Sequence, residues 1–319
     1  MFRFGPIGDL LRWILELIYR VIPNYGWAVI VFTLLIRILL LPFDIKSKRS
    51  MKRTAAIQPQ LDALNKKYAN DREKLAQKQQ ELYRREKINP LSGCLPMLIQ
   101  LPILFAMFAV MREVANEETI QMILEIKQNI LAGIENYQPK LQSLLWIKNV
   151  FQPDSFMSTV VPAFGSTLPE ITKASGTVTM EMIEEAKAFL QTNEYSAWAA
   201  NYGNAVAYSA PLLMWTITIP KKFNGLFILP ILSAVSQFFT SKFMNAGQQS
   251  SNAQQASTNK FMQWFFPLFS LWICASSNAA FALYWVFINV FQIAQQFIIG
   301  KLIDRSEKKK KLIEEASTK

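Results

Sequence analysis

The chain has 319 residues, of which 51% are hydrophobic and only 18% are charged. Its uncharged residues come in long blocks, with 24 residues at 88–111, 26 at 195–220 and 40 at 261–300, and about 20 apolar residues are enough to cross a bilayer. This pattern excludes a disordered chain and indicates an all-α integral membrane protein rather than a soluble globule. The net charge of +11 then bears on which side of the membrane the basic segments lie.

Residues 1–24 are expected to form an amphipathic helix that lies in the membrane interface. Arg12, Glu16 and Arg20 are four residues apart and fall on one helical face, opposite leucine, isoleucine and tryptophan. The alternative is a signal peptide, but the charges interrupt the apolar stretch and no small-residue cleavage site follows them.

Five spans account for the other apolar blocks and predict a five-span helical bundle. The first is expected to leave the membrane near Pro42 and Asp44. The last block is long enough for two spans joined by a tight turn at 276–278. The predicted spans are 25–43, 89–112, 223–242 and a pair within 261–300.

A strongly basic segment, 44–88, follows the first span. It holds thirteen Lys and Arg residues against six Asp and Glu residues, and apolar Ile57, Leu61 and Leu64 recur in it at helical spacing. Asn70–Asp71 offers a turn and a helix N-cap. The pattern predicts a hairpin of two amphipathic helices outside the membrane, and the alternative is a solvated charged linker.

The charges of the connecting segments predict the orientation. The long loop at 113–222 has seven basic and eleven acidic residues, whereas the tail at 301–319 has seven basic and four acidic residues. Because cytoplasmic segments carry the excess of Lys and Arg, we expect the basic hairpin, the polar loop 243–260 and the tail in the cytoplasm. The N-terminus and the loop 113–222 are then outside.

The uncharged run 195–220 would change this topology if it crossed the membrane, because the tail and the basic hairpin would then lie on opposite sides. It begins with the weakly apolar stretch YSAWAANYGN. We therefore expect an interfacial or partly embedded segment of the external loop. Earlier in that loop, Met180–Phe189 is expected to form a short amphipathic helix.

Arg37 lies inside the first predicted span, about 16 Å below its start at 1.5 Å per residue. Arginine at that depth costs about 2.5–3.5 kcal/mol on insertion scales, and none of the predicted spans contains Asp or Glu. Arg37 must then face water, backbone carbonyls or neutral polar side chains. The other spans offer Gln100, Ser236, Gln237, Thr240, Gln263, Asn289, Gln292, Gln295 and Gln296.

Three of these side chains share one helical face. Asn289, Gln292 and Gln296 stand at positions i, i+3 and i+7. Together with Arg37 they predict a hydrated, positively charged cavity within the bundle. The alternative is that Arg37 extends toward the cytoplasmic headgroups, since Asp44 is only about 10 Å along the helix.

Several stretches, in chain order, carry a resemblance to a known family. The most specific is NPLSGCLPMLIQLPILFAMF at 89–108. The others are TLLIRILLLPF at 33–43, the basic hairpin, SLLWIKNVFQPD at 143–154, FILPILSAVSQF at 227–238 and ALYWVFINVFQIAQ at 282–295. They resemble the YidC family of membrane protein insertases, which has mitochondrial and chloroplast relatives. Two parts depart from it, the link SSNAAF at 276–281 and an insertion at about 155–222 without a counterpart.

The resemblance implies a multi-pass protein of the bacterial plasma membrane that inserts and helps fold other membrane proteins, alone or with the Sec translocon. It implies a client-binding groove in which Arg37 attracts acidic residues of the client's external segment. The groove residues would be Arg37, Gln100, Gln237, Asn289, Gln292 and Gln296, with Tyr284 and Trp285 as aromatics of the groove or of an apolar slide.

The partners so implied are nascent membrane proteins, with the ribosome and the Sec translocon as further candidates. The charge of the basic hairpin suits anionic lipid, and the alternative is RNA bound by charge alone. We expect no sequence-specific nucleic-acid binding. We expect no catalytic residue, metal or cofactor and no enzyme activity, and the chain lacks the ATP-binding pattern GxxxxGK[ST].

Two other classes of protein remain as alternatives, although each accounts for the buried arginine less well than an insertase does. A small-solute transporter or anion channel would more often show repeated halves and paired broken helices, and neither is visible in the sequence. A passive scaffold or lipid-binding protein would not need a cation at mid-depth.

Overall fold

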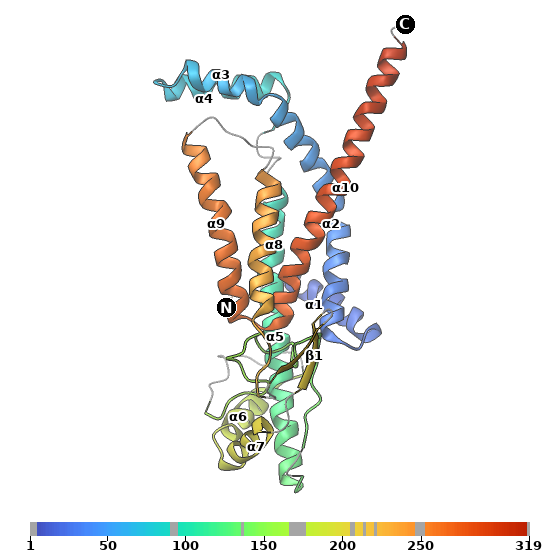
Figure 1. Ribbon diagram of the computed structural model, residues 1–319, viewed down its shortest axis with the longest axis vertical. Coiled ribbons are helices and arrows are strands. Elements are labelled where there is room, and N and C mark those ends of the chain that lie inside the picture. The colour runs from blue at the N-terminus through green and yellow to red at the C-terminus, as the bar shows by residue number, and fades with distance from the viewer. Residues whose placement is uncertain are drawn as a thin grey trace. The chain divides into compact units, whose positions relative to one another are not determined.

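The protein is described by a computed structural model that covers residues 5–89, 95–134, 137–165, 177–204, 208–212, 215–219, 222–245 and 253–317. Its helices and strands follow one another along the chain as Figure 1 shows. The elements are α1 (Gly5–Val21), α2 (Tyr25–Ala56), α3 (Gln58–Lys67), α4 (Arg72–Arg85), α5 (Leu95–Leu131), α6 (Met180–Phe189), α7 (Asn193–Asn204), β1 (Tyr208–Leu212), β2 (Trp215–Ile219), α8 (Ile228–Asn245), α9 (Ala253–Ser276) and α10 (Ala279–Ser317).

The chain divides into two compact units. Unit 1 comprises Met1–Thr33, Ile103–Ser233 and Ser270–Val286, and unit 2 comprises Leu34–Pro102, Ala234–Phe269 and Phe287–Lys319. The boundaries fall within α2, α5, α8, α9 and α10, so each of these helices contributes residues to both units.

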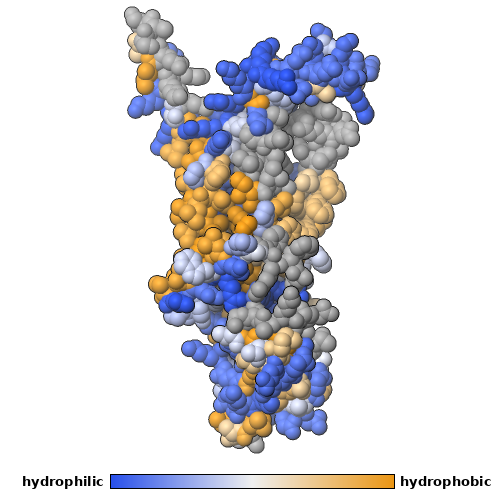
Figure 2. All heavy atoms as spheres, turned by 180° about the vertical axis from the view of Figure 1, so that it is seen from behind, coloured by the Kyte–Doolittle hydropathy of each residue, from blue (hydrophilic) through white to orange (hydrophobic). Residues whose placement is uncertain are grey.

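Long apolar helices identify an integral membrane protein. Among the described residues, three helical stretches are long and apolar enough to cross a membrane: Tyr25–Ala56, Ile99–Leu131 and Ala279–Ser306. Figure 2 shows hydrophobic residues gathered into a broad region of the surface. Helices α8 and α9 also expose large apolar side chains, such as Phe239, Trp264 and Leu268, but neither is among the three stretches. The fold is a helical membrane protein, and the count of five spans stays a prediction.

An apolar core in unit 1 joins the C-terminal part of α5 to α6 and α7. Ile120 and Ile123 on α5, Ile183 on α6 and Tyr195 on α7 are all fully buried in it. The Tyr195 hydroxyl donates a hydrogen bond of 2.6 Å to the carbonyl of Pro162. Helix α6 begins and ends where the sequence predicts, with Thr179 as its N-cap.

Part of the run 195–220 contributes to this core, since Tyr195, Trp198 and Tyr202 pack with α5 and α6. Its position at the membrane interface stays a prediction. Further on, β1 and β2 pair as an antiparallel hairpin, with Tyr208 opposite Ile219. The sequence analysis did not predict this hairpin, although threonine and isoleucine alternate at 216–219 with the period of a strand.

A second centre in unit 1 is polar and fixes the start of α8. The Asp154 carboxylate accepts hydrogen bonds from the backbone N–H groups of Leu226 at 2.9 Å, Phe227 at 3.2 Å and Leu229 at 2.7 Å, and from the Trp146 indole at 3.1 Å. Three unsatisfied donors at a helix start are thus paired with one carboxylate.

The neighbouring Asn224 completes this polar centre. Its amide nitrogen donates to the carbonyls of Asn149, Gln152 and Pro153 at 2.8–3.1 Å, and its oxygen accepts from the backbone N–H of Asn149. The segment 149–154 also accepts hydrogen bonds from the first backbone N–H groups of α10. One loop therefore caps the beginnings of both α8 and α10.

The basic segment of unit 2 forms two helices rather than a linker. Helices α3 and α4 share a small core that includes Ile57, Leu61 and Leu82. The Asp71 side chain accepts a 3.0 Å hydrogen bond from the backbone N–H of Lys74, which confirms the predicted N-cap of α4. The cytoplasmic position of this hairpin stays a prediction.

Candidate functional site

Arg37 lies on α2 in unit 2 and is almost completely buried, with 5% of its surface exposed. Its guanidinium donates from Nη2 to the carbonyl of Ile288 at 3.1 Å and to Oε1 of Gln292 at 2.6 Å. Both acceptors are on α10, one helical turn apart. The sequence predicted a carbonyl or neutral polar partner for Arg37, and the structure confirms both kinds at once.

The expectation that Arg37 has no acidic partner is wrong. Helix α2 continues past Pro42 to Ala56, so Asp44 stands two turns beyond Arg37 on the same helix. The Arg37 Nη1 and Asp44 Oδ2 atoms are 3.8 Å apart, and Asp44 also accepts a 2.8 Å hydrogen bond from the amide of Gln295. The sequence analysis placed Asp44 outside the first span and so did not count it as a partner, although the i, i+7 spacing puts both residues on one helical face.

A second polar contact links α8 and α10 within unit 2. The amide of Asn289 donates to Ser236 Oγ at 3.3 Å and to Gln237 Oε1 at 3.1 Å. The structure therefore brings together Arg37 with Gln292, and Asn289 with Gln237. Gln100 and Gln296 are half-buried and belong to neither pair, so their place in a groove stays a prediction.

Tyr284 and Trp285 belong to unit 1. Their side chains are 0% and 5% exposed, and both rings pack against Phe281 at centroid distances of 6.2 and 5.6 Å. Neither ring offers a surface to a client in this structure. Packing within unit 1 accounts for both residues, and we leave them out of the proposed groove.

The arrangement around Arg37 combines neutral hydrogen-bond acceptors with an acidic neighbour. The guanidinium is fixed by neutral acceptors on α10, and its one described acidic partner is held separately by Gln295. A buried cation without an anion nearby would be costly. If an acidic group of another chain takes the place of Asp44, the Arg37 guanidinium can pair with that group instead.

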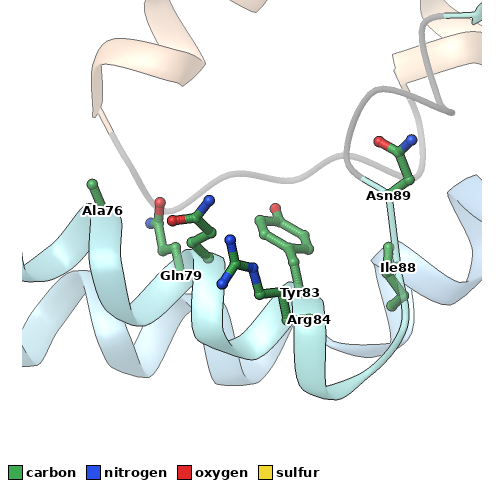
Figure 3. Close-up of a pocket in the computed structure, with 7 residues that line it drawn as sticks. Ala76, Gln79, Tyr83, Arg84, Ile88 and Asn89 are labelled. Carbon is green, nitrogen blue, oxygen red and sulfur yellow. The ribbon is translucent and has the colours of Figure 1, made fainter.

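The basic hairpin carries a second candidate site. A cavity of about 490 Å³ lies beside α4 and is lined by Ala76, Gln79, Gln80, Tyr83, Arg84, Ile88 and Asn89. Figure 3 shows Gln79, Tyr83 and Arg84 extending from α4 toward this space. Amide, phenol and guanidinium groups suit an acidic or peptide ligand. The sequence showed the charge of the hairpin but no sign of the cavity.

Comparison with known proteins identifies the family. The family model described as "60Kd inner membrane protein" matches residues 17–308. The "Membrane protein insertase YidC" of Treponema denticola is 28% identical over 297 residues, which are 93% of this chain and 38% of that protein. The Coxiella burnetii protein of the same name is 48% identical over 108 residues, which are 34% of this chain and 19% of that protein.

A solved structure is also similar to this chain. It is titled "Active YidC insertase crystal structure with the first transmembrane domain resolved" and matches 92% of this chain and 46% of its own, at a TM-score of 0.42 and 18% identity. The match thus spans less than half the length of each of the relatives named here. The family match covers nearly all of it, and the chain belongs to the 60Kd inner membrane protein family, that of the YidC insertases.

Proposed function

We propose that this protein is an insertase that inserts membrane proteins into the bilayer and helps them fold. Family membership supports the insertase activity. The observation that carries the mechanism is the buried guanidinium of Arg37, which donates to the Ile288 carbonyl and Gln292 and lies 3.8 Å from the Asp44 carboxylate. Such a group attracts negative charge into a region from which lipid would exclude it.

In this proposal the groove lies beside Arg37 and is hydrated. Gln237, Asn289 and Gln292 supply hydrogen-bonding groups, with Gln100 and Gln296 farther along the same lining. An acidic residue in the external segment of a client is drawn to Arg37, which shortens the path of that segment through hydrocarbon. Each unit charge left at the bilayer centre would otherwise cost several kcal/mol.

The apolar part of the client needs a different surface. In unit 2, α8 and α9 expose Val235, Phe239, Phe261, Trp264 and Leu268. These side chains offer a face along which a client helix leaves the groove and enters lipid. The step is one of transfer and binding, and it requires no covalent chemistry from this chain.

We further propose a location in the bacterial plasma membrane, with the N-terminus outside and the C-terminus in the cytoplasm. The excess of basic residues in the hairpin and in the tail supports this orientation. Both cytoplasmic segments would face anionic lipid and the ribosome. Nascent membrane proteins are the clients, and the Sec translocon is a further partner.

The experiment that tests the activity uses proteoliposomes that contain only this protein. A single-span client with an acidic external segment is added, and its protection from protease inside the vesicle is measured. We expect insertion above that of empty liposomes, and no flux of small anions in the same vesicles. Anion flux without insertion would instead support the channel or transporter alternative.

A further inference from the structure

The acidic partner of Arg37 comes from the same helix. Arg37 and Asp44 stand two turns apart on α2, with side chains that are 5% and 8% exposed. Each is held by a different glutamine of α10, since Gln292 accepts from Arg37 and Gln295 donates to Asp44. The Asp44 carboxylate therefore offsets part, but not all, of the positive charge that Arg37 presents to an incoming chain.

The contact between the two charged groups is loose. Their separation of 3.8 Å is longer than the 2.7–3.2 Å of an ordinary N–H···O hydrogen bond. The short hydrogen bonds, of 2.6 and 2.8 Å, go instead to the two glutamines. A different carboxylate can therefore replace Asp44 as the neighbour of Arg37 while the hydrogen bonds that position both side chains remain.

We propose that Asp44 is a specificity-determining residue, whose carboxylate takes the place of a client carboxylate at Arg37 and sets how acidic a client must be to engage the groove. This inference rests on the insertase function proposed above. A client with several acidic residues competes well with Asp44, whereas a client with one competes poorly, because the Coulomb energy grows with charge. The groove then discriminates between clients by competition from Asp44 as well as by the attraction of Arg37.

The test compares clients whose external segments carry zero, one or three acidic residues. Asp44→Asn removes the charge but keeps an oxygen that can accept from Gln295. We expect insertion of the one-acid client to rise about three- to tenfold, with the three-acid and neutral clients nearly unchanged. Asp62→Asn is the matched control, because it makes the same change on α3, where Asp62 contacts Gln58, and it should alter nothing.

A second variant covers the case in which Asp44→Asn is poorly folded. Combining it with Gln295→Glu returns a carboxylate to the site from α10 and keeps the site neutral. We expect this double variant to fold and to restore the wild-type dependence on client charge. A well-folded double variant that favours the one-acid client would overturn the proposal.

Arg37→Ala separates this inference from the proposed function. If Arg37→Ala inserts the acidic clients as well as wild type does, the charged groove is wrong and the role of Asp44 falls with it. If Arg37→Ala loses insertion but Asp44→Asn leaves the one-acid client at or below the wild-type level, the groove stands and Asp44 is only structural. We expect Asp44→Asn to have no effect on client preference in the Arg37→Ala background.

Discussion

Two buried polar centres of this protein are built in opposite ways. Asp154 in unit 1 accepts four hydrogen bonds, three of them from backbone N–H groups. Arg37 in unit 2 contacts one carbonyl and the side chains of Gln292 and Asp44. Backbone partners have fixed positions once the helix forms, whereas side-chain partners can rotate away and be replaced.

The difference distinguishes a structural centre at Asp154 from the functional centre proposed at Arg37. Asp154 joins the segment 149–154 to the start of α8 and leaves no room for a ligand, since a Cβ on Gly225 would lie 1.9 Å from its Oδ1. Arg37 is held beside an anion that it does not touch at hydrogen-bond distance. Changes at Asp154 should therefore alter stability, and changes at Arg37 should alter insertion.

The largest loss of stability is expected from Gly225→Ala. The added methyl group displaces the Asp154 carboxylate, and with it the cap of α8, so we expect the unfolding free energy to fall by about 2–4 kcal/mol. Gly300→Ala is the matched control, because nothing lies within 4 Å of its Cβ position on α10. Thermal unfolding in detergent measures both, and equal melting temperatures would show that the Asp154 centre is not structural.

An intermediate effect is expected from Arg12→Gln. The guanidinium of Arg12 on α1 contacts Glu16 at 2.7 Å, Glu113 at 3.1 Å and Glu117 at 2.8 Å, and the hydrogen bond to Glu117 raises the pKa of Arg12. Its loss leaves these carboxylates facing one another and should cost about 1–2 kcal/mol.

The same change should loosen α1 and increase its digestion in limited proteolysis. Arg20→Gln is the control, because Arg20 is exposed in the last turn of the same helix. Equal digestion of the two variants would mean that the ion cluster does not hold α1.

The smallest effect on stability is expected from Asn289→Ala. Asn289 is buried, but its described partners, Ser236 and Gln237, are side chains. In a hydrated groove water replaces the lost amide, so we expect less than about 1 kcal/mol. Thermal unfolding beside Gly225→Ala measures the difference. If Asn289→Ala lowers the unfolding free energy as much as Gly225→Ala does, the groove is dry and the two centres do not differ in this way.

The sequence predicted local features more successfully than distant ones. Helix α6 and the cap at Asp71 follow from residues within a few positions of one another. The contact of Asp44 with Arg37 was missed because Asp44 was placed outside the first span, whereas α2 continues through Pro42 and keeps both residues on one helix. A proline inside a helix loses one hydrogen bond, which neighbouring helices can offset.

The surroundings of the aromatic residues in the run 195–220 could not be predicted from the sequence. An apolar aromatic such as Trp198 is equally suited to lipid and to a protein core, and only the fold decides between them. The fold gave Trp198 a core made of α5, α6 and α7. The glutamines of α10 also differ from the prediction. The sequence placed Gln292 and Gln296 on the face toward Arg37, whereas Gln292 and Gln295 contact Arg37 and Asp44 on α2.

The central claim is that Arg37 acts through its charge in the groove. The most direct measurement is the insertion of one client, with and without its acidic residues, by wild type, Arg37→Lys, Arg37→Ala and Arg37→Glu at equal abundance. We predict that lysine retains much of the insertion of the acidic client, since a positive charge remains at that depth, and that alanine and glutamate lose it. The neutral client should depend less on Arg37, and insertion of the acidic client by Arg37→Ala at the wild-type level would contradict the account.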